Sequence, residues 1–148
     1  MLKRAEKRNK VCLIILHSIL PLIFGTLIYL FYRKKTLLVF QWIDIINLKE
    51  EVAYLRELFN PNNNLYSNFF THNLPDALWV YSFTSFLIIL YQKKENHNTS
   101  IIYFIPLIIA ATSEILQLTN LIPGTFDYID LFSYVSSSII SIKYLTNH

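Results

Sequence analysis

Four polar side chains lie close together near the C-terminal end of the chain, within the sequence SEILQLTNLIPGTFDYID. Glu114 and Gln117 are three residues apart, and so are Asp127 and Asp130, so each pair shares one face of a helix. Neighbouring carboxylates in an apolar setting raise one another's pKa, which suits a general acid or a proton carrier. Carboxylate oxygens also bind divalent cations. The sequence therefore predicts a polar pocket here and leaves both kinds of chemistry open.

A second group of polar residues surrounds the start of an earlier helix. Asp76 and Trp79 are three residues apart, and His72 lies one turn before Asp76. Acids that open a helix also stabilise its dipole, and this structural role is an alternative for Asp76 and Asp127. No catalytic role is assigned to any one residue. The candidate pocket consists of Glu114, Gln117, Asp127, Asp130, Asp76, Trp79 and His72.

The elements that must position these residues are long and apolar. Of the 148 residues, 53% are hydrophobic and only 16% are charged, against roughly 25% charged in an average soluble domain. The segment Val11–Tyr32 contains no charged residue and would form a helix roughly 33 Å long, enough to cross a bilayer core. We expect an all-α polytopic membrane protein, a single membrane domain over residues 1–148. Its transmembrane helices are predicted at approximately 11–32, 74–91, 100–119 and 126–145.

The long loop 33–73 between the first two predicted spans has structure of its own. Residues 36–46 are apolar but too few to cross a membrane. An apolar stripe of Leu48, Val52, Leu55 and Phe59 predicts an amphipathic helix, capped at its start by Asn47 and ended by Asn60-Pro61. We interpret residues 36–59 as an interfacial or re-entrant segment, with a plain pair of surface helices as the alternative. Residues 60–64 are expected to form a turn or linker.

The orientation follows from the basic residues. The first ten residues, MLKRAEKRNK, contain five basic side chains and one acid, a pattern that stays on the cytoplasmic side. Four spans then place both termini in the cytoplasm and the loop 33–73 outside. In this topology the acids of the candidate pocket fall in the outer halves of their helices. The short connection 120–125, with Pro123-Gly124 as its turn, makes the faces of Glu114 and Asp127 neighbours.

Three features of the spans concern packing. Ser133, Ser137 and Ser141 form a stripe of small residues suited to contact between helices. His17 is expected to hydrogen-bond to a neighbouring helix rather than to act in catalysis, and Pro106 is expected to kink the third span.

Composition excludes several classes of protein. The two glycines, Gly25 and Gly124, cannot build a Gly-rich phosphate loop, and the single Cys12 cannot form an internal disulfide. A net charge of +3 is too weak for a nucleic-acid binder, so no nucleic-acid partner is expected. Common hydrolase and zinc-protease motifs are absent, and no cofactor is expected.

The stretch from Ser113 to Tyr134 resembles the VanZ-like family of small bacterial integral membrane proteins. The family pattern is a Glu-x-x-Gln pair near a helix end, a short turn and an Asp-x-x-Asp pair opening the last helix, which correspond here to Glu114, Gln117, Asp127 and Asp130. The resemblance implies a cell-envelope protein in a bacterial plasma (inner) membrane. It also implies an association with tolerance to glycopeptide antibiotics of the teicoplanin type, without a settled biochemical activity.

Three functions remain open from the sequence. The first is an envelope protein whose outward-facing acidic pocket binds a membrane lipid, a lipid-linked envelope precursor or another surface ligand. The second is a membrane-embedded enzyme that acts on a lipid headgroup through an acid/base pair or a metal. The third is a small proton- or cation-coupled carrier, which requires a homo-oligomer because four helices rarely enclose a path alone.

Overall fold

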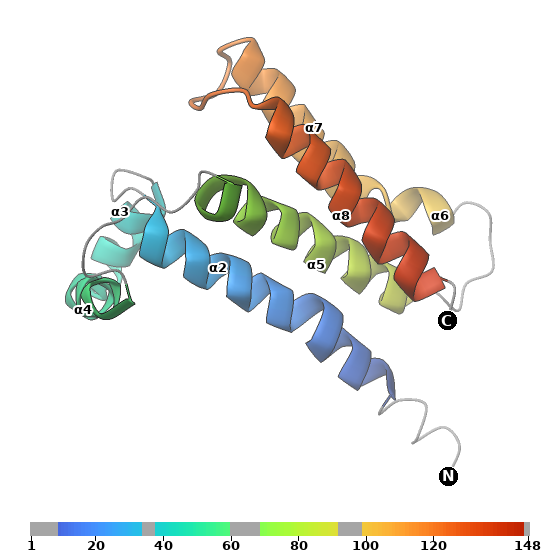
Figure 1. Cartoon of the computed structure of the whole chain (residues 1–148), viewed down its shortest axis with the longest axis horizontal. Helices are drawn as coiled ribbons and strands as arrows, with labels where there is room; N and C mark the ends of the chain where they lie inside the picture. The colour runs from blue at the N-terminus through green and yellow to red at the C-terminus, as the bar shows by residue number, and fades with distance from the viewer. Residues whose placement is uncertain (1–8, 34–37, 60–68, 92–98, 147–148) are drawn as a thin grey trace.

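The structure is a computed structural model that describes residues 9–33, 38–59, 69–91 and 99–146 (Figure 1). Every regular element in these ranges is a helix, which confirms the all-α prediction. Residues 1–8 and 92–98, on which the predicted orientation partly depends, lie outside the described ranges, as do Asn60-Pro61 and the predicted turn over residues 60–64.

Two helices are long and apolar enough to cross a membrane. They span Asn9–Tyr32, with 24 residues, and Phe69–Tyr91, with 23 residues. The helix Ile105–Leu118 is apolar but shorter. The last helix, α8 (Tyr128–Thr146), has 19 residues, but its five serines, Asp130 and Lys143 make it less apolar.

Prolines shape both long helices. In the first, the π-helical turn η1 (Ile15–Ile19) precedes α2 (Leu20–Tyr32), whose first turn contains Pro21. In the second, the π-helical turn η2 (Phe69–Asn73) precedes α5 (Leu74–Tyr91), which contains Pro75 at its start. Proline has no N–H to donate to the carbonyl four residues earlier. The wider π-helical turn ahead of each proline accommodates this missing backbone hydrogen bond.

The third predicted span, 100–119, is interrupted. The short helix α6 (Thr99–Ile102) ends before a turn at Tyr103–Phe104, and α7 (Ile105–Leu118) begins there with Pro106 in its first turn. The irregularity predicted at Pro106 is present, but it is larger than a kink, because a two-residue turn directly ahead of the proline divides the span into two helices. α7 and α8 then form a hairpin (Figure 1).

α5 is the central helix and contacts α2, α7 and α8. It runs antiparallel to the first helix, since Lys10 Nζ donates to the Leu90 carbonyl at one end and Arg33 meets Asp76 at the other. It runs parallel to α8, since Asn73 meets Asp130 and Ser85 meets Ser141. The first and last described residues, Asn9 and Thr146, therefore lie at the same end of the bundle (Figure 1).

The interior of the bundle is rich in small polar residues. Ser133, Ser137 and Ser141 are all buried on α8, which packs against α5, so the predicted role of the serine stripe in helix contact is confirmed. Beyond Ser141 the interface closes with the apolar cluster of Ile88, Ile89 and Leu145. Large apolar side chains instead face outward on the first helix, α7 and α8: Phe24, Ile109 and Phe132 are 64%, 65% and 72% exposed.

The loop between the long helices contains α3 (Leu38–Ile45) and α4 (Lys49–Phe59), packed beside the end of α2. Asn47 has a left-handed φ of 56°, and the N–H groups of Asn47 and Leu48 bond back to Asp44 and Ile43. Asn47 thus ends α3, and the prediction that it caps the start of α4 is wrong, because an N-cap requires an extended backbone.

α4 is attached to α2 by Arg56. Its guanidinium donates to the carbonyls of Leu30 and Arg33, which belong to the C-terminal end of α2. These carbonyls have no partner within the helix, and a cation there also complements the helix dipole. Phe59 stacks on Phe31 with 4.9 Å between ring centroids. Both contacts fix the orientation of α4 relative to the bundle.

Candidate functional site

Glu114 is the most deeply buried carboxylate of the predicted pocket, with 3% of its surface exposed. Its Oε2 accepts a hydrogen bond from the backbone N–H of Asp127 at 3.2 Å, and its Oε1 accepts one from the Tyr134 hydroxyl at 3.3 Å. The tight α7–α8 connection places both donors beside the carboxylate, as its length predicted. Both oxygens of Glu114 therefore have a donor from α8 or its start.

A second carboxylate of the site joins α8 to the start of α5. Asn73, with 2% of its surface exposed, donates from Nδ2 to Asp130 Oδ1 at 2.6 Å. Asn73 is the last residue of η2, so the π-helical turn directs its side chain toward α8. This contact fixes the depth at which the two parallel helices meet.

The third carboxylate is paired with a base. Arg33 Nη2 lies 3.0 Å from Asp76 Oδ2, and the two side chains are 18% and 25% exposed. The same guanidinium donates to the carbonyls of Thr71 at 3.2 Å and His72 at 3.0 Å. Thr71 lies four residues before Pro75, which has no N–H to donate to that carbonyl. Arg33 thus bonds the irregular start of the second long helix and neutralises its first acid.

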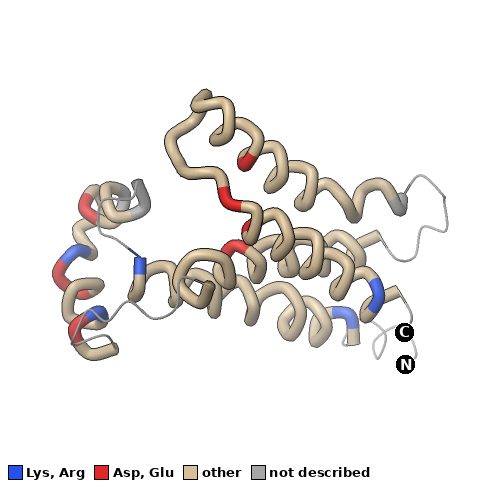
Figure 2. The backbone as a smooth tube through the Cα atoms, turned by 45° about the horizontal axis from the view of Figure 1, so that its top comes forward, with Lys and Arg blue, Asp and Glu red and all other residues tan. Residues whose placement is uncertain are grey.

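These carboxylates form one electrostatic unit. Asp76 interacts with both Asp130 and Glu114, and Asp130 interacts in turn with Arg33 and His72. Figure 2 shows acids of α5, α7 and α8 gathered toward one end of the bundle, whereas basic residues lie beside the two termini at the other. We call Glu114, Asp130, Asp76 and Arg33, with their donors Tyr134 and Asn73, the acidic site. Its carboxylates outnumber its bases.

The other predicted residues lie around this site in different roles. Asp127 Oδ1 accepts the N–H of Ile129 at 2.8 Å, which is the helix-start role that the sequence left open. Gln117 packs on Gly124 in the α7–α8 turn. Trp79 stacks on Tyr29 with 6.0 Å between ring centroids and also contacts Gly25, so it packs against α2. His72 Nδ1 lies 2.7 Å from Thr71 Oγ1.

The predicted candidate pocket does not include Arg33, Asn73 or Tyr134. Arg33 is 43 residues from Asp76, across a loop of undetermined course, so spacing could not join them. The sequence did offer one signal. Arg33 follows the end of the first predicted span and Asp76 opens the second, and two consecutive antiparallel spans bring these two ends to the same side. Asn73 and Tyr134 each lie within one turn of a predicted acid, which could have suggested them as donors.

The contacts of the acidic site are hydrogen bonds and an ion pair. In the described ranges, no three His, Cys, Asp or Glu side chains are placed to hold one metal ion. The acid/base alternative is compatible with this geometry, because Glu114 is a buried carboxyl group in contact with the Tyr134 hydroxyl.

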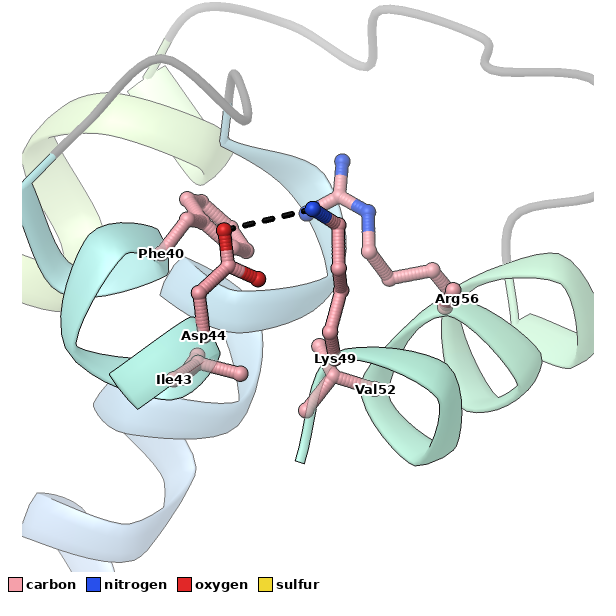
Figure 3. A pocket seen from close by; sticks show the side chains of 7 residues that line it. Phe40, Ile43, Asp44, Lys49, Val52 and Arg56 are labelled. Atoms are coloured by element: carbon pink, nitrogen blue, oxygen red, sulfur yellow. Dashed lines mark hydrogen bonds and ion pairs between the residues drawn. The ribbon is translucent and has the colours of Figure 1, made fainter. Parts of the chain in front are cut away.

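A separate cavity lies between α3 and α4, away from the acidic site (Figure 3). It has a volume of about 280 Å³, an apolar floor that includes the buried Phe40 and Ile43, and polar groups at Asp44, Lys49 and Arg56. Lys49 Nζ pairs with Asp44 Oδ2 at 3.3 Å, and the Arg56 guanidinium lies over the Phe40 ring. These contacts hold the two loop helices together.

Comparison with known proteins yields no relative: no protein-family model, no curated protein and no solved structure matches the chain.

Proposed function

We propose that the chain is a VanZ-like integral protein of the bacterial cell envelope that crosses the plasma membrane four times. The two long apolar helices supply two of the crossings. For α7 and α8, support comes from where their residues face: serines and Glu114 lie inside, whereas Ile109 and Phe132 face outward. Apolar side chains outside and small polar ones between helices are typical of packing in lipid.

The proposed activity is binding of a cationic ligand, lipid-linked or at the outer surface, at the acidic site. The observation that carries this proposal is the buried Glu114 beside Asp130 and Asp76, where Arg33 is the one base that forms an ion pair with these acids in the described part of the chain. Buried carboxylates are costly in a membrane and mark functional sites there. A ligand ammonium would supply the missing positive charge through charge-assisted hydrogen bonds. A lipid with an amine headgroup or an amine-bearing envelope precursor has this chemistry.

Native mass spectrometry of the purified protein tests this binding. The protein would be offered phosphatidylethanolamine, which has an ammonium group, and phosphatidylglycerol, which has none. We expect preferential retention of the first, and a loss of affinity of about tenfold in Glu114→Gln, which corresponds to ~1.4 kcal/mol. Asp44→Asn, which changes an exposed acid outside the site, serves as the control. Equal retention of both lipids by the unchanged protein would contradict the proposal.

The resemblance supplies a cellular test of the same site. Expression in a teicoplanin-susceptible bacterium should raise the concentration of drug needed to stop growth. The Glu114→Gln/Asp130→Asn variant, produced at the same level in the membrane, should not. Equal protection by both proteins would separate any antibiotic tolerance from the acidic site.

A further inference from the structure

A second polar network runs through the other half of the bundle. His17 Nδ1 lies 2.8 Å from the Tyr81 hydroxyl, as expected for a histidine bonded to a neighbouring helix. Tyr81 shares a side-chain hydrogen bond with Ser85, and Ser85 Oγ lies 2.9 Å from Ser141 Oγ. Ser85 and Ser141 are completely buried. This network connects the first helix, α5 and α8.

Three buried hydroxyls border this network without a hydrogen-bond partner in the described part of the chain: Ser18, Thr84 and Ser138. They are 6%, 0% and 0% exposed. Serine and threonine in a helix ordinarily donate to a carbonyl of the preceding turn, as Thr26 and Ser82 do here. A dry hydroxyl without a partner is unfavourable, and buried water is the usual partner for such groups.

Ser138 lies between the two polar networks along α8. Ser138 lies four residues after Tyr134, which donates to Glu114, and three residues before Ser141. It therefore stands one helical turn from each network, on the buried face of α8. Thr84 and Ser18 are each adjacent in sequence to a network member, Ser85 and His17. Of the three unpartnered hydroxyls, Ser138 is therefore the one that lies along α8 between the acidic site and the His17 network.

We propose that Tyr134, Ser138, Ser141, Ser85 and Tyr81 form a path that carries protons between Glu114 and His17. This hydroxyl chain, bridged by water at Ser138, rests on the four-span topology proposed above. When Glu114 is protonated, it gives its proton to the Tyr134 oxygen and becomes a carboxylate. Each hydroxyl along the path, and the bridging water, accepts one proton as it passes its own to the next group, so every one of them ends neutral. Tyr81 passes the last proton to His17 Nδ1, and the imidazolium releases one from Nε2.

The geometry at both ends suits this transfer. At Glu114, Tyr134 and the N–H of Asp127 contact the carboxylate, while Asp76, Asp127 and Asp130 act on it electrostatically. At His17, the ring faces Tyr81 of α5 and Tyr144 of α8, with ring centroids 6.3 and 5.2 Å away. Beyond Ser141, the apolar cluster of Ile88, Ile89 and Leu145 closes the α5–α8 interface, so the path turns to His17.

Proton flux into vesicles tests the path. The full-length protein would be reconstituted into liposomes that contain the pH dye pyranine, and a potassium gradient with valinomycin would supply the driving potential. We expect acidification faster than in protein-free liposomes. Tyr81→Phe keeps the ring but removes the relay hydroxyl, and it should reduce the flux to the protein-free level. Ser82→Ala removes a buried hydroxyl that bonds its own helix, and it should conduct like the unchanged protein.

Two results would overturn the proposal: no flux above protein-free liposomes, or undiminished flux in Tyr81→Phe. Ser138→Ala provides a second measurement. It should reduce flux without raising the melting temperature in detergent, whereas a gain in stability would mean that the hydroxyl lies dry and unpaired. Cysteine labelling of the same preparation checks the topology separately, so a failure of the path is distinguishable from a failure of the four-span proposal.

Discussion

Arg33 and Asp76 join the end of the first long helix to the start of the second, with 3.0 Å between Nη2 and Oδ2. The guanidinium also holds two carbonyls of the π-helical turn ahead of Pro75. One side chain therefore closes an antiparallel pair of helices, bonds an irregular backbone segment and balances one acid of a site rich in carboxylates.

The losses from removing Arg33 and from removing Asp76 should not add, because each single variant leaves the other side chain without its partner. Arg33→Gln leaves Asp76 beside Asp130 and Glu114 without its cation, and we expect a loss of about 1–3 kcal/mol in the free energy of unfolding. The double variant Arg33→Gln/Asp76→Asn should lose less than the sum of the single variants. Unfolding in mixed detergent micelles measures all three. Additive losses would show that the two side chains do not act as a pair.

The positions of the helices were largely predictable because apolar runs set them. The predicted span 74–91 coincides with α5, and 126–145 lies within two residues of α8 at its start and one at its end. Pro106 predicted an irregularity in 100–119, but apolar composition does not show whether a proline bends a helix or interrupts its backbone hydrogen bonds completely. The amphipathic stripe predicted α4, but the left-handed conformation of Asn47 reversed its expected capping role.

The part of the site that a short connection between helices brings together was predictable. The six-residue connection 120–125 forced Glu114 and the start of α8 together, and the structure places the Asp127 N–H on Glu114. Trp79 was grouped with Asp76 because they share a helix face, yet it packs on Gly25 of α2. Helical spacing shows which residues share a face and leaves open which neighbour that face meets.

Gly124 should resist substitution for two separable reasons. Its φ of 150° is unfavourable for any residue with a Cβ, and an added Cβ would lie 2.5 Å from Gln117 Cδ. We expect Gly124→Ala to cost about 1–3 kcal/mol. Adding Gln117→Ala removes the steric contact but not the backbone strain, so it should restore only part of the stability. Full restoration would assign the whole cost to the side chain of Gln117.

Ser137 should tolerate no large side chain. It is 8% exposed on the α8 face that packs on α5, and Ser137→Leu should cost about 1–3 kcal/mol by overpacking. Val135→Leu enlarges a residue that is 43% exposed on the same helix, and it should leave the melting temperature nearly unchanged. Equal melting temperatures for both variants would place Ser137 toward lipid.

The orientation can be measured in intact cells. In a Cys12→Ser background, Asn62→Cys should react with an impermeant thiol reagent, because the loop 33–73 is predicted outside. His97→Cys should react only after the cells are opened. Labelling of position 97 alone in intact cells would reverse the orientation and place the acidic site toward the cytoplasm.

Glu114 should show whether the acidic site serves structure or function. Both of its oxygens accept a hydrogen bond, so Glu114→Gln keeps one acceptor and loses the charge, whereas Glu114→Leu leaves the Tyr134 hydroxyl and the Asp127 N–H unpaired. Each unpaired buried donor costs about 1–3 kcal/mol, so the leucine variant should be clearly less stable than the glutamine variant. Lipid retention should instead fall in both variants, because it depends on the charge. If Glu114→Gln lost as much stability as Glu114→Leu while lipid retention stayed unchanged, the carboxylate would be a structural partner of α8, and the binding site would lie elsewhere.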